Sequence, residues 1–199
     1  VDQTVTSWLD VGVNVLLSRY TRSSSDTNAF FQAFVNPPVY NIYNDSNKVA
    51  YPEKFDSPQL YGFGNSYANP YAVARYNENS EKGTNLVFST YAQLNFLDGK
   101  LKMKTSYNLD MQSYRTQGYV PEYFVGGSQG VSVSTLTKIY GLSDSHIIDN
   151  TITYTDLIGR HSFSVMAGQS TRIERFSAMN GSGINVPAYD SQSMYISNG

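Results

Sequence analysis

Apolar and polar residues alternate with a period of two in five stretches of the chain. That period places successive side chains on opposite faces of a β-strand. The stretch 101–112 is the most regular, with Leu101, Met103 and Leu109 on one face and lysines or aspartate on the other. We therefore predict five strands, over residues 8–20, 85–96, 101–112, 147–155 and 162–171.

Over residues 9–17, 86–96, 101–111, 148–154 and 163–167, one face of each predicted strand carries no Asp, Glu, Lys or Arg. The opposite faces carry the charged residues Asp10, Lys102, Lys104, Asp110 and Asp149. Leu16, Asn150 and Met166 break the alternation. A soluble β-sandwich also has one face in its core and one in water, so alternation alone favours that common architecture.

The connections between the predicted strands change this preference. Residues 97–100 contain Asp98-Gly99, which tolerates the positive φ angles of a type I′ hairpin turn, and residues 156–160 are similarly short. The remaining segments, 21–84, 113–146 and 172–199, are long. Alternate connections of a meander lie at the same end, and outer-membrane barrels have short turns at one end and long loops at the other.

The predicted fold class is therefore all-β, an antiparallel up-and-down meander that forms a segment of a large transmembrane β-barrel with long extracellular loops. In such a barrel the uncharged faces contact lipid, because Lys or Arg at mid-bilayer costs about 2–4 kcal/mol. We expect lipid contact at Leu9, Val13, Leu94, Leu109 and Val165. Rings near strand ends are candidates for the headgroup layer or are ordinary sheet residues: Trp8, Tyr20, Phe96 and Tyr154. The alternative is a soluble or surface-anchored β-sandwich that binds glycans through aromatic loops.

The first long connection contains one predicted helix and many aromatic residues. Asp26 is a candidate cap for a helix that ends before Pro37. Beyond it, tyrosine rings and asparagine amides suit sugars or peptides, because rings stack on C–H faces and amides bond hydroxyl or backbone groups. The candidate ligand-binding residues are Tyr40, Tyr43, Asn44, Tyr61, Phe63 and Tyr67. The alternative for any one ring is that it packs a core of the loop itself, so ligand binding is predicted for the set and not for a single residue.

Composition narrows the possible functions. With 14 basic and 16 acidic residues the net charge is −2, so no nucleic-acid partner is expected. No cysteine is present, which excludes thiolate metal sites and cysteine nucleophiles. Asp144, His146 and Asp149 are spaced for a metal, but Asp144 fits better as part of a turn before the fourth strand. We expect no enzymatic activity, cofactor or metal, and no run of apolar residues is long enough for a membrane helix.

Three stretches also resemble a known family. They are Asn-Pro-Pro-Val-Tyr-Asn-Ile-Tyr-Asn at 36–44, Asn-Pro-Tyr-Ala at 69–72, and the hairpin at 153–168 with Gly159-Arg160-His161 followed by Met166-Ala167-Gly168. Together they resemble an internal barrel segment of the SusC/RagA family of TonB-dependent outer-membrane transporters.

The resemblance implies import of oligosaccharides or peptides across the outer membrane of a Gram-negative, Bacteroidetes-type bacterium. It further implies two partners, a SusD-like surface lipoprotein that covers the long loops and the TonB complex, which acts through a plug region. Residues 1–199 contain no recognisable plug domain, TonB-contacting segment or signal sequence. We therefore expect this chain to be one segment of a longer protein.

Overall fold

Within residues 1–24 and 26–186, which a computed structural model describes, the chain forms one six-stranded sheet, one separate two-stranded hairpin and three short helices. The strands are β1 Asp2–Thr6, β2 Leu9–Ser24, β3 Glu78–Phe96, β4 Leu101–Val120, β5 Tyr123–Gly126, β6 Gln129–Val131, β7 Thr135–Ile158 and β8 His161–Ile184. The helices are α1 Thr27–Val35, the 3₁₀ helix η1 Pro58–Tyr61 and α2 Pro70–Tyr76. No helix among the described residues has the length and apolar character needed to cross a membrane.

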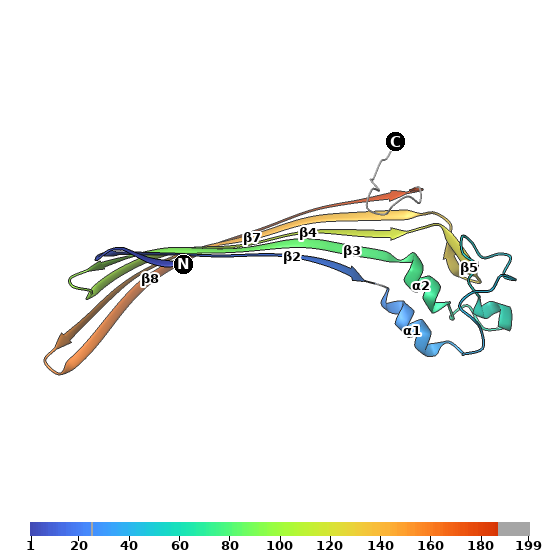
Figure 1. Ribbon diagram of the computed structural model, residues 1–199, viewed down its shortest axis with the longest axis horizontal. Coiled ribbons are helices and arrows are strands. Elements are labelled where there is room, and N and C mark those ends of the chain that lie inside the picture. Colours follow the sequence, from blue (N-terminus) through green and yellow to red (C-terminus); the bar gives the residue numbers. More distant parts are fainter. Residues whose placement is uncertain (25, 187–199) are drawn as a thin grey trace. The chain divides into compact units, whose positions relative to one another are not determined.

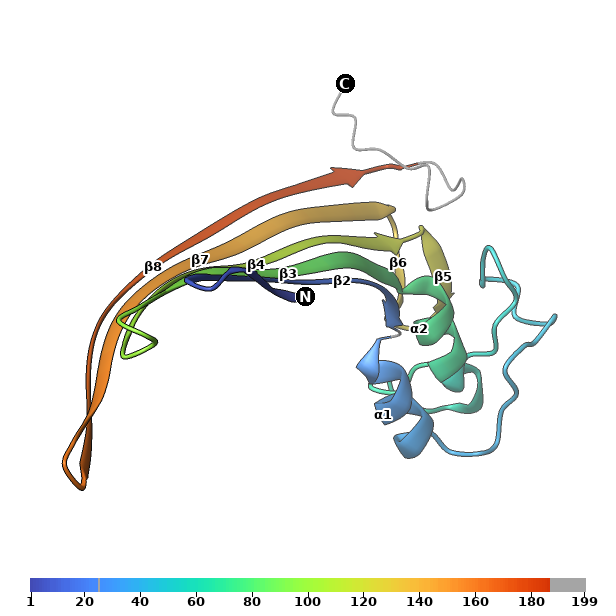
Figure 2. The ribbon, with the colours of Figure 1, turned by 60° about the vertical axis from the view of Figure 1, so that its left-hand side comes forward.

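The large sheet is a meander with strand order β1-β2-β3-β4-β7-β8 (Figure 1). Both ribbon views show β2, β3, β4, β7 and β8 side by side in that order (Figure 2). Short turns at residues 7–8, 97–100 and 159–160 alternate with the long connections 25–77 and 121–134. The predicted class, an all-β antiparallel up-and-down meander, is confirmed.

The strands are longer than the alternation indicated. The stretch predicted from residue 85 begins at Glu78 in β3, and the stretch predicted to end at 112 continues to Val120 in β4. These extensions are polar on both faces, as at Glu78–Lys82, so they carry no period-two signal. Backbone pairing continues there because the neighbouring strands are extended as well.

Two segments placed in loops by the sequence belong to strands. β7 begins at Thr135, so Asp144, which was expected in a turn before the fourth strand, lies within a strand, as does His146. β8 continues to Ile184, so the first part of the predicted loop 172–199 is strand, while residues 187–199 lie outside the described residues. Hydrogen bonds to neighbouring strands, which local sequence does not reveal, decide both cases.

The chain divides into two compact units. The sheet unit comprises residues 1–20, 83–114 and 141–178, and the described part of the loop unit comprises 21–24, 26–82, 115–140 and 179–186. Every buried hydrophobic side chain among the described residues lies in the loop unit. In the described sheet unit the only buried residues are three glycines, so that unit is a single layer without a hydrophobic core of its own.

The apolar stripes of the sheet unit are accordingly uncovered in this chain. Val13 and Val165 are exposed, and Leu9, Leu94 and Leu109 are partly exposed. A β-sandwich would bury these five side chains beneath a second sheet, and the described sheet unit contains strands of one sheet alone. The sandwich alternative is therefore not favoured.

Tyrosine rings from adjacent strands cover the three buried glycines. Tyr91 covers Gly12, Tyr20 covers Gly83, and the ring of Tyr114 covers Gly141; a Cβ at any of these glycines would overlap the ring. Strand alternation places these three glycines and three tyrosines on the faces that carry polar residues. Tyr20 is thus part of the polar face and does not join the rings at the strand end.

The β3–β4 turn carries backbone strain. Leu97 and Asp98 have φ angles of 53° and 52°, and Gly99 N–H donates to Phe96 O at 3.1 Å. A left-handed conformation costs a residue such as leucine about 1–2 kcal/mol, and asparagine tolerates it better. We expect Leu97→Asn to raise the free energy of unfolding by about 1 kcal/mol in denaturant titrations. Leu97→Ala, which keeps the strain, should give no gain; equal gains in both variants would contradict this explanation.

Candidate functional site

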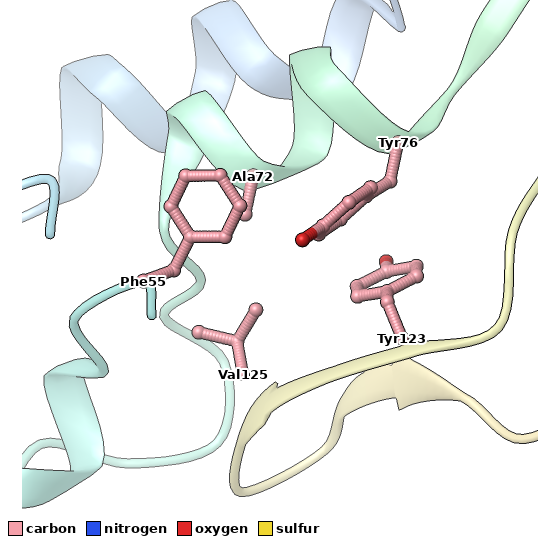
Figure 3. Packing of buried hydrophobic residues seen from close by; sticks show 5 residues of the cluster. All are labelled: Phe55, Ala72, Tyr76, Tyr123 and Val125. Carbon is pink, nitrogen blue, oxygen red and sulfur yellow. The ribbon is translucent and has the colours of Figure 1, made fainter. Parts of the chain in front are cut away.

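The long β2–β3 connection folds around a small aromatic core in the loop unit. Phe55, Ala72 and Tyr76 pack against Tyr123 and Val125 of β5 (Figure 3). The Tyr76 and Tyr123 rings stack with centroids 4.3 Å apart, and the edge of Tyr76 meets Phe55 at 5.4 Å. The connection is therefore ordered by its own packing. This agrees with the alternative in which the rings pack a core of the loop itself.

Buried amides tie this connection to the β5–β6 hairpin. Asn47 Nδ2 donates to Phe55 O at 2.7 Å and to Val125 O at 2.8 Å. Asn69 N–H donates to Gln129 Oε1 at 2.7 Å, and Gln129 Nε2 donates back to Asn69 O at 3.0 Å. Asn69 also caps α2, with its side-chain oxygen accepting from Tyr71 N–H at 3.1 Å. Polar groups thus fix the positions of segments that contain few apolar residues.

A fully buried carboxylate, Asp56, anchors the aromatic segment. Its two oxygens accept hydrogen bonds from four groups: Asn41 N–H (3.1 Å), Asn44 Nδ2 (2.9 Å), Ser57 N–H (3.0 Å) and Tyr61 Oη (2.9 Å). Two of these donors, Asn44 and Tyr61, are predicted ligand-binding residues. The amide of Asn44 and the hydroxyl of Tyr61 thus hold the loop in shape through this carboxylate, while Tyr61 stays 45% exposed.

The predicted ligand-binding rings form three groups. Tyr43 stacks on Phe55 at 4.9 Å and meets Tyr71 edge-on at 5.9 Å, with Tyr43 and Tyr71 each about half exposed. Tyr40 and Tyr61 have centroids 6.2 Å apart, and Phe63 and Tyr67 are 5.8 Å apart. Ligand contact by these residues stays a prediction. Tyr71, which meets Tyr43 on this surface, and the buried Asp56, which holds the loop beneath Tyr61, were not among the predicted ligand-binding residues.

Helix α1 presents phenylalanines outward. Asp26 caps it as predicted, accepting from Asn28 N–H at 2.9 Å, and the helix ends before Asn36. Its buried residues are Ala29 and Gln32, and the Gln32 side chain pairs with the backbone of 66–68. The exposed fractions of Phe30, Phe31 and Phe34 are 77%, 59% and 88%. An apolar surface of this kind on an ordered helix is typical of a contact site.

The buried tyrosines of this region predict a fall in stability at alkaline pH. Burial, aided by the nearby Asp56 carboxylate, raises the pKa of Tyr40 to about 12, and burial raises the pKa of Tyr76 to about 12. In the unfolded chain tyrosine ionises near pH 10. A raised pKa in the folded state contributes stability that is complete below pH 10 and is lost as pH rises towards 12.

We therefore expect the loop unit to lose stability between pH 10 and 12, measured by near-ultraviolet circular dichroism during denaturant titration. Tyr40→Phe should make this loss shallower, and it also removes a hydroxyl that is buried without a hydrogen-bond partner. Equal alkaline losses in the wild type and the variant would contradict this account.

His146 is the middle member of a row of three hydrogen-bonded side chains on the sheet. His146 Nδ1 lies 2.8 Å from Tyr107 Oη, and His146 Nε2 lies 2.9 Å from Asp144 Oδ2. Asp149, grouped with them by sequence spacing, accepts from Ser170 Oγ at 2.6 Å instead. Among the described residues no three His, Asp or Glu side chains are arranged to hold a metal ion.

Comparison with known proteins identifies structural neighbours. Neither a protein-family model nor a curated protein matches the chain. The structure of the RagAB peptide transporter matches with a TM-score of 0.65 and 15% identity, over 92% of this chain and 20% of that one. The RagAB peptide importer matches over all of this chain and 22% of that one, with a TM-score of 0.68 and 17% identity in its 'closed-closed' state and 16% in its 'open-open' state.

This chain thus spans about a fifth of the length of the structures that it matches. At these identities the likeness shows the fold, an all-β segment of a larger, barrel-like protein.

Proposed function

We propose that this chain is a segment of a SusC/RagA-type, TonB-dependent transporter in the outer membrane of a Gram-negative, Bacteroidetes-type bacterium. The observation that carries the proposal is the sheet unit, a single layer whose apolar stripes have no protein core among the described residues to cover them. A bilayer supplies such a cover, and a closed barrel satisfies the strand edges that an isolated sheet leaves open. The fold shared with RagAB structures supports the same proposal.

The strands are longer than a membrane crossing requires. A tilted membrane strand needs about 9–11 residues. The five long strands contain 16, 19, 20, 24 and 24 residues. The part of each strand near the short turns carries the apolar stripe, with the rings of Tyr154 and Phe163 5.9 Å apart on that face near the β7–β8 turn. In the proposal these rings lie at the inner headgroup layer.

The loop unit supplies the ligand-facing surface of the transporter. Tyr43, Tyr61 and Tyr71 expose rings on a framework fixed by Asp56. Rigid rings of this kind bind without a large loss of side-chain entropy. A peptide is the ligand class we favour, because the similar solved structures are described as peptide transporters; an oligosaccharide is the other class that tyrosine and asparagine suit.

The proposal includes two partners and no enzymatic step. A SusD-like surface lipoprotein would cover the loop unit, and the exposed Phe30 and Phe34 of α1 offer an apolar contact for it. The TonB complex would act through a plug region in another part of the transporter. Transport is thus a property of the whole protein, to which this chain contributes strands and a ligand-facing loop region.

A binding experiment tests the proposal. Short peptides and oligosaccharides are titrated into the purified protein in detergent by calorimetry, with Tyr43→Ala and Tyr61→Ala as variants. We expect peptide binding, weakened about tenfold in each variant. Tyr51→Ala removes a similarly exposed ring that stacks on Phe124 and should leave the affinity unchanged. Absence of binding by both ligand classes, or equal affinities in all variants, would refute the proposed role of these rings.

A further inference from the structure

The β7–β8 turn, at the end of the orange hairpin in Figure 1, combines exposed apolar side chains with exposed basic ones. The exposed fractions of Leu157, Ile158 and Phe163 are 65%, 65% and 37%. Arg160 and His161 lie between them and are exposed as well. Among the described residues, neither basic side chain has a partner in a hydrogen bond or an ion pair. Apolar surface beside such groups matches a ligand that has both an apolar and an anionic part.

The tight turn fixes which of these side chains share a face. β7 ends at Ile158 and β8 begins at His161, with Gly159 at a φ angle of 62° and Arg160 between them. Ile158 and His161 therefore flank the turn as neighbours. Strand alternation places both on the face of Phe163, which is the face of the apolar stripe. The whole hairpin end belongs to the sheet unit.

The nearest carboxylate along this face of the hairpin is already balanced. Asp156 Oδ1 lies 2.7 Å from Lys100 Nζ, and Asp156 Oδ2 accepts from Tyr154 Oη at 2.9 Å. Because Lys100 compensates this carboxylate, the positive charge of Arg160 is left available to an anionic ligand.

We propose that this turn binds the headgroup of an anionic phospholipid in the inner leaflet of the outer membrane. The phosphate lies at Arg160 and His161, and the upper part of the acyl chains lies against Ile158 and Phe163. The inference rests on the proposed function, which places Phe163 at the inner headgroup layer. The surface continues the apolar stripe for which lipid contact is already proposed, and basic groups at a membrane surface attract anionic headgroups.

Positions along the strand agree with this arrangement. His161 lies two residues beyond Phe163 towards the turn, and Arg160 lies three beyond it. At about 3.3 Å per residue and a strand tilt of about 45°, these positions are about 5–7 Å further from the bilayer centre than Phe163. The headgroup layer of one leaflet is about 5–8 Å thick. The basic side chains therefore reach the phosphates while Phe163 stays at the boundary with the acyl chains.

The two basic side chains suit a lipid phosphate in different ways. The Arg160 guanidinium offers a planar fork that pairs with two phosphate oxygens, and a His161 ring N–H donates to one. A free phosphate ion would gain these contacts without covering Ile158, whereas a phospholipid gains both. A zwitterionic headgroup carries its own cation beside the phosphate, so a headgroup with net negative charge is favoured.

A fluorescent label on the stripe face tests this proposal. The whole transporter, otherwise free of cysteine, carries bimane on Val165→Cys, close to where the acyl chains of the bound lipid would lie. Phosphatidylglycerol and phosphatidylcholine, each with a nitroxide at the same acyl position, are compared as quenchers in vesicles. We expect phosphatidylglycerol to quench at about fivefold lower mole fraction, the effect of one basic residue at a membrane surface.

The variants locate the preference. Arg160→Gln should remove the preference for phosphatidylglycerol. Lys102→Gln removes a cation that also lies near a short turn but on the polar face, and it should leave the preference unchanged. Inorganic phosphate added at constant ionic strength should not compete, because a free ion lacks the apolar contact.

Equal quenching by the two lipids, a preference that survives Arg160→Gln, or a preference that inorganic phosphate abolishes would overturn the proposed site. Quenching by the labelled phosphatidylcholine separates this failure from that of the proposed function. If both lipids quench equally, Val165 lies in lipid and the headgroup site alone is removed. If neither lipid quenches, the proposed membrane location fails, and the site fails with it.

Discussion

Asp56→Ala is expected to destabilise the loop unit by about 3–5 kcal/mol, because it leaves four buried or half-buried donors without their acceptor. Asn41 N–H, Ser57 N–H, Asn44 Nδ2 and Tyr61 Oη all point at this one carboxylate. Hydrogen–deuterium exchange should show the loss as faster exchange throughout residues 41–69.

Asp45→Ala is the matched control, since Asp45 is an exposed aspartate of the same connection. It should leave exchange unchanged. Exchange in the Asp56→Ala protein as slow as in the wild type would show that the aromatic core holds the connection without the carboxylate. Because Tyr61 is one of its donors, the same variant should also weaken any ligand binding that depends on this ring.

Val13→Arg is expected to destabilise the protein in bilayers by about 2–4 kcal/mol, the cost of a cation at a lipid-facing mid-membrane position. Val13 lies in the middle of the stripe that runs from Leu9 to Leu17 and is exposed in this chain. Folding of the whole transporter into lipid vesicles during urea titration, followed by circular dichroism, gives the free energy directly.

Asn14→Arg places the same charge one residue further, on the polar face of the strand. Polar-face positions tolerate charge, so this variant should stay within about 1 kcal/mol of the wild type. Equal losses at both positions would mean that the two faces of β2 have similar surroundings, which the proposed membrane location does not allow.

Sequence patterns predicted the presence of the five long strands but not their lengths. Alternation ends where both faces become polar, as at Glu78–Lys82, and pairing with long neighbours continues the strand without any local signal. The short strand β1 has little alternation of its own, and it forms because its backbone pairs with β2 from Asp2↔Gly12 to Thr6↔Leu9. Strand ends are thus decided by partners.

In the loop unit, the sequence predicts a helix where the capping residue directly precedes it. Asp26 predicted α1 correctly, and Asn69 followed by Pro70 is an equally clear signal for the start of α2. The role of Asp56 was not predictable, because its donors come from positions up to 15 residues away. Burial of Tyr40 and exposure of Tyr43 also depend on long-range packing, which composition alone does not specify.

Labelling one strand with nitroxides in lipid bilayers tests the central claim most directly. This chain has no cysteine, so a single cysteine placed in it, in an otherwise cysteine-free transporter, carries one label. Labels at Val11, Val13 and Val15 should be accessible to oxygen dissolved in lipid, and labels at Asp10, Asn14 and Ser18 to a water-soluble nickel reagent, so that accessibility alternates between odd and even positions along β2. Accessibility to the nickel reagent at both sets, or protection of the valine positions from both reagents, would contradict the account.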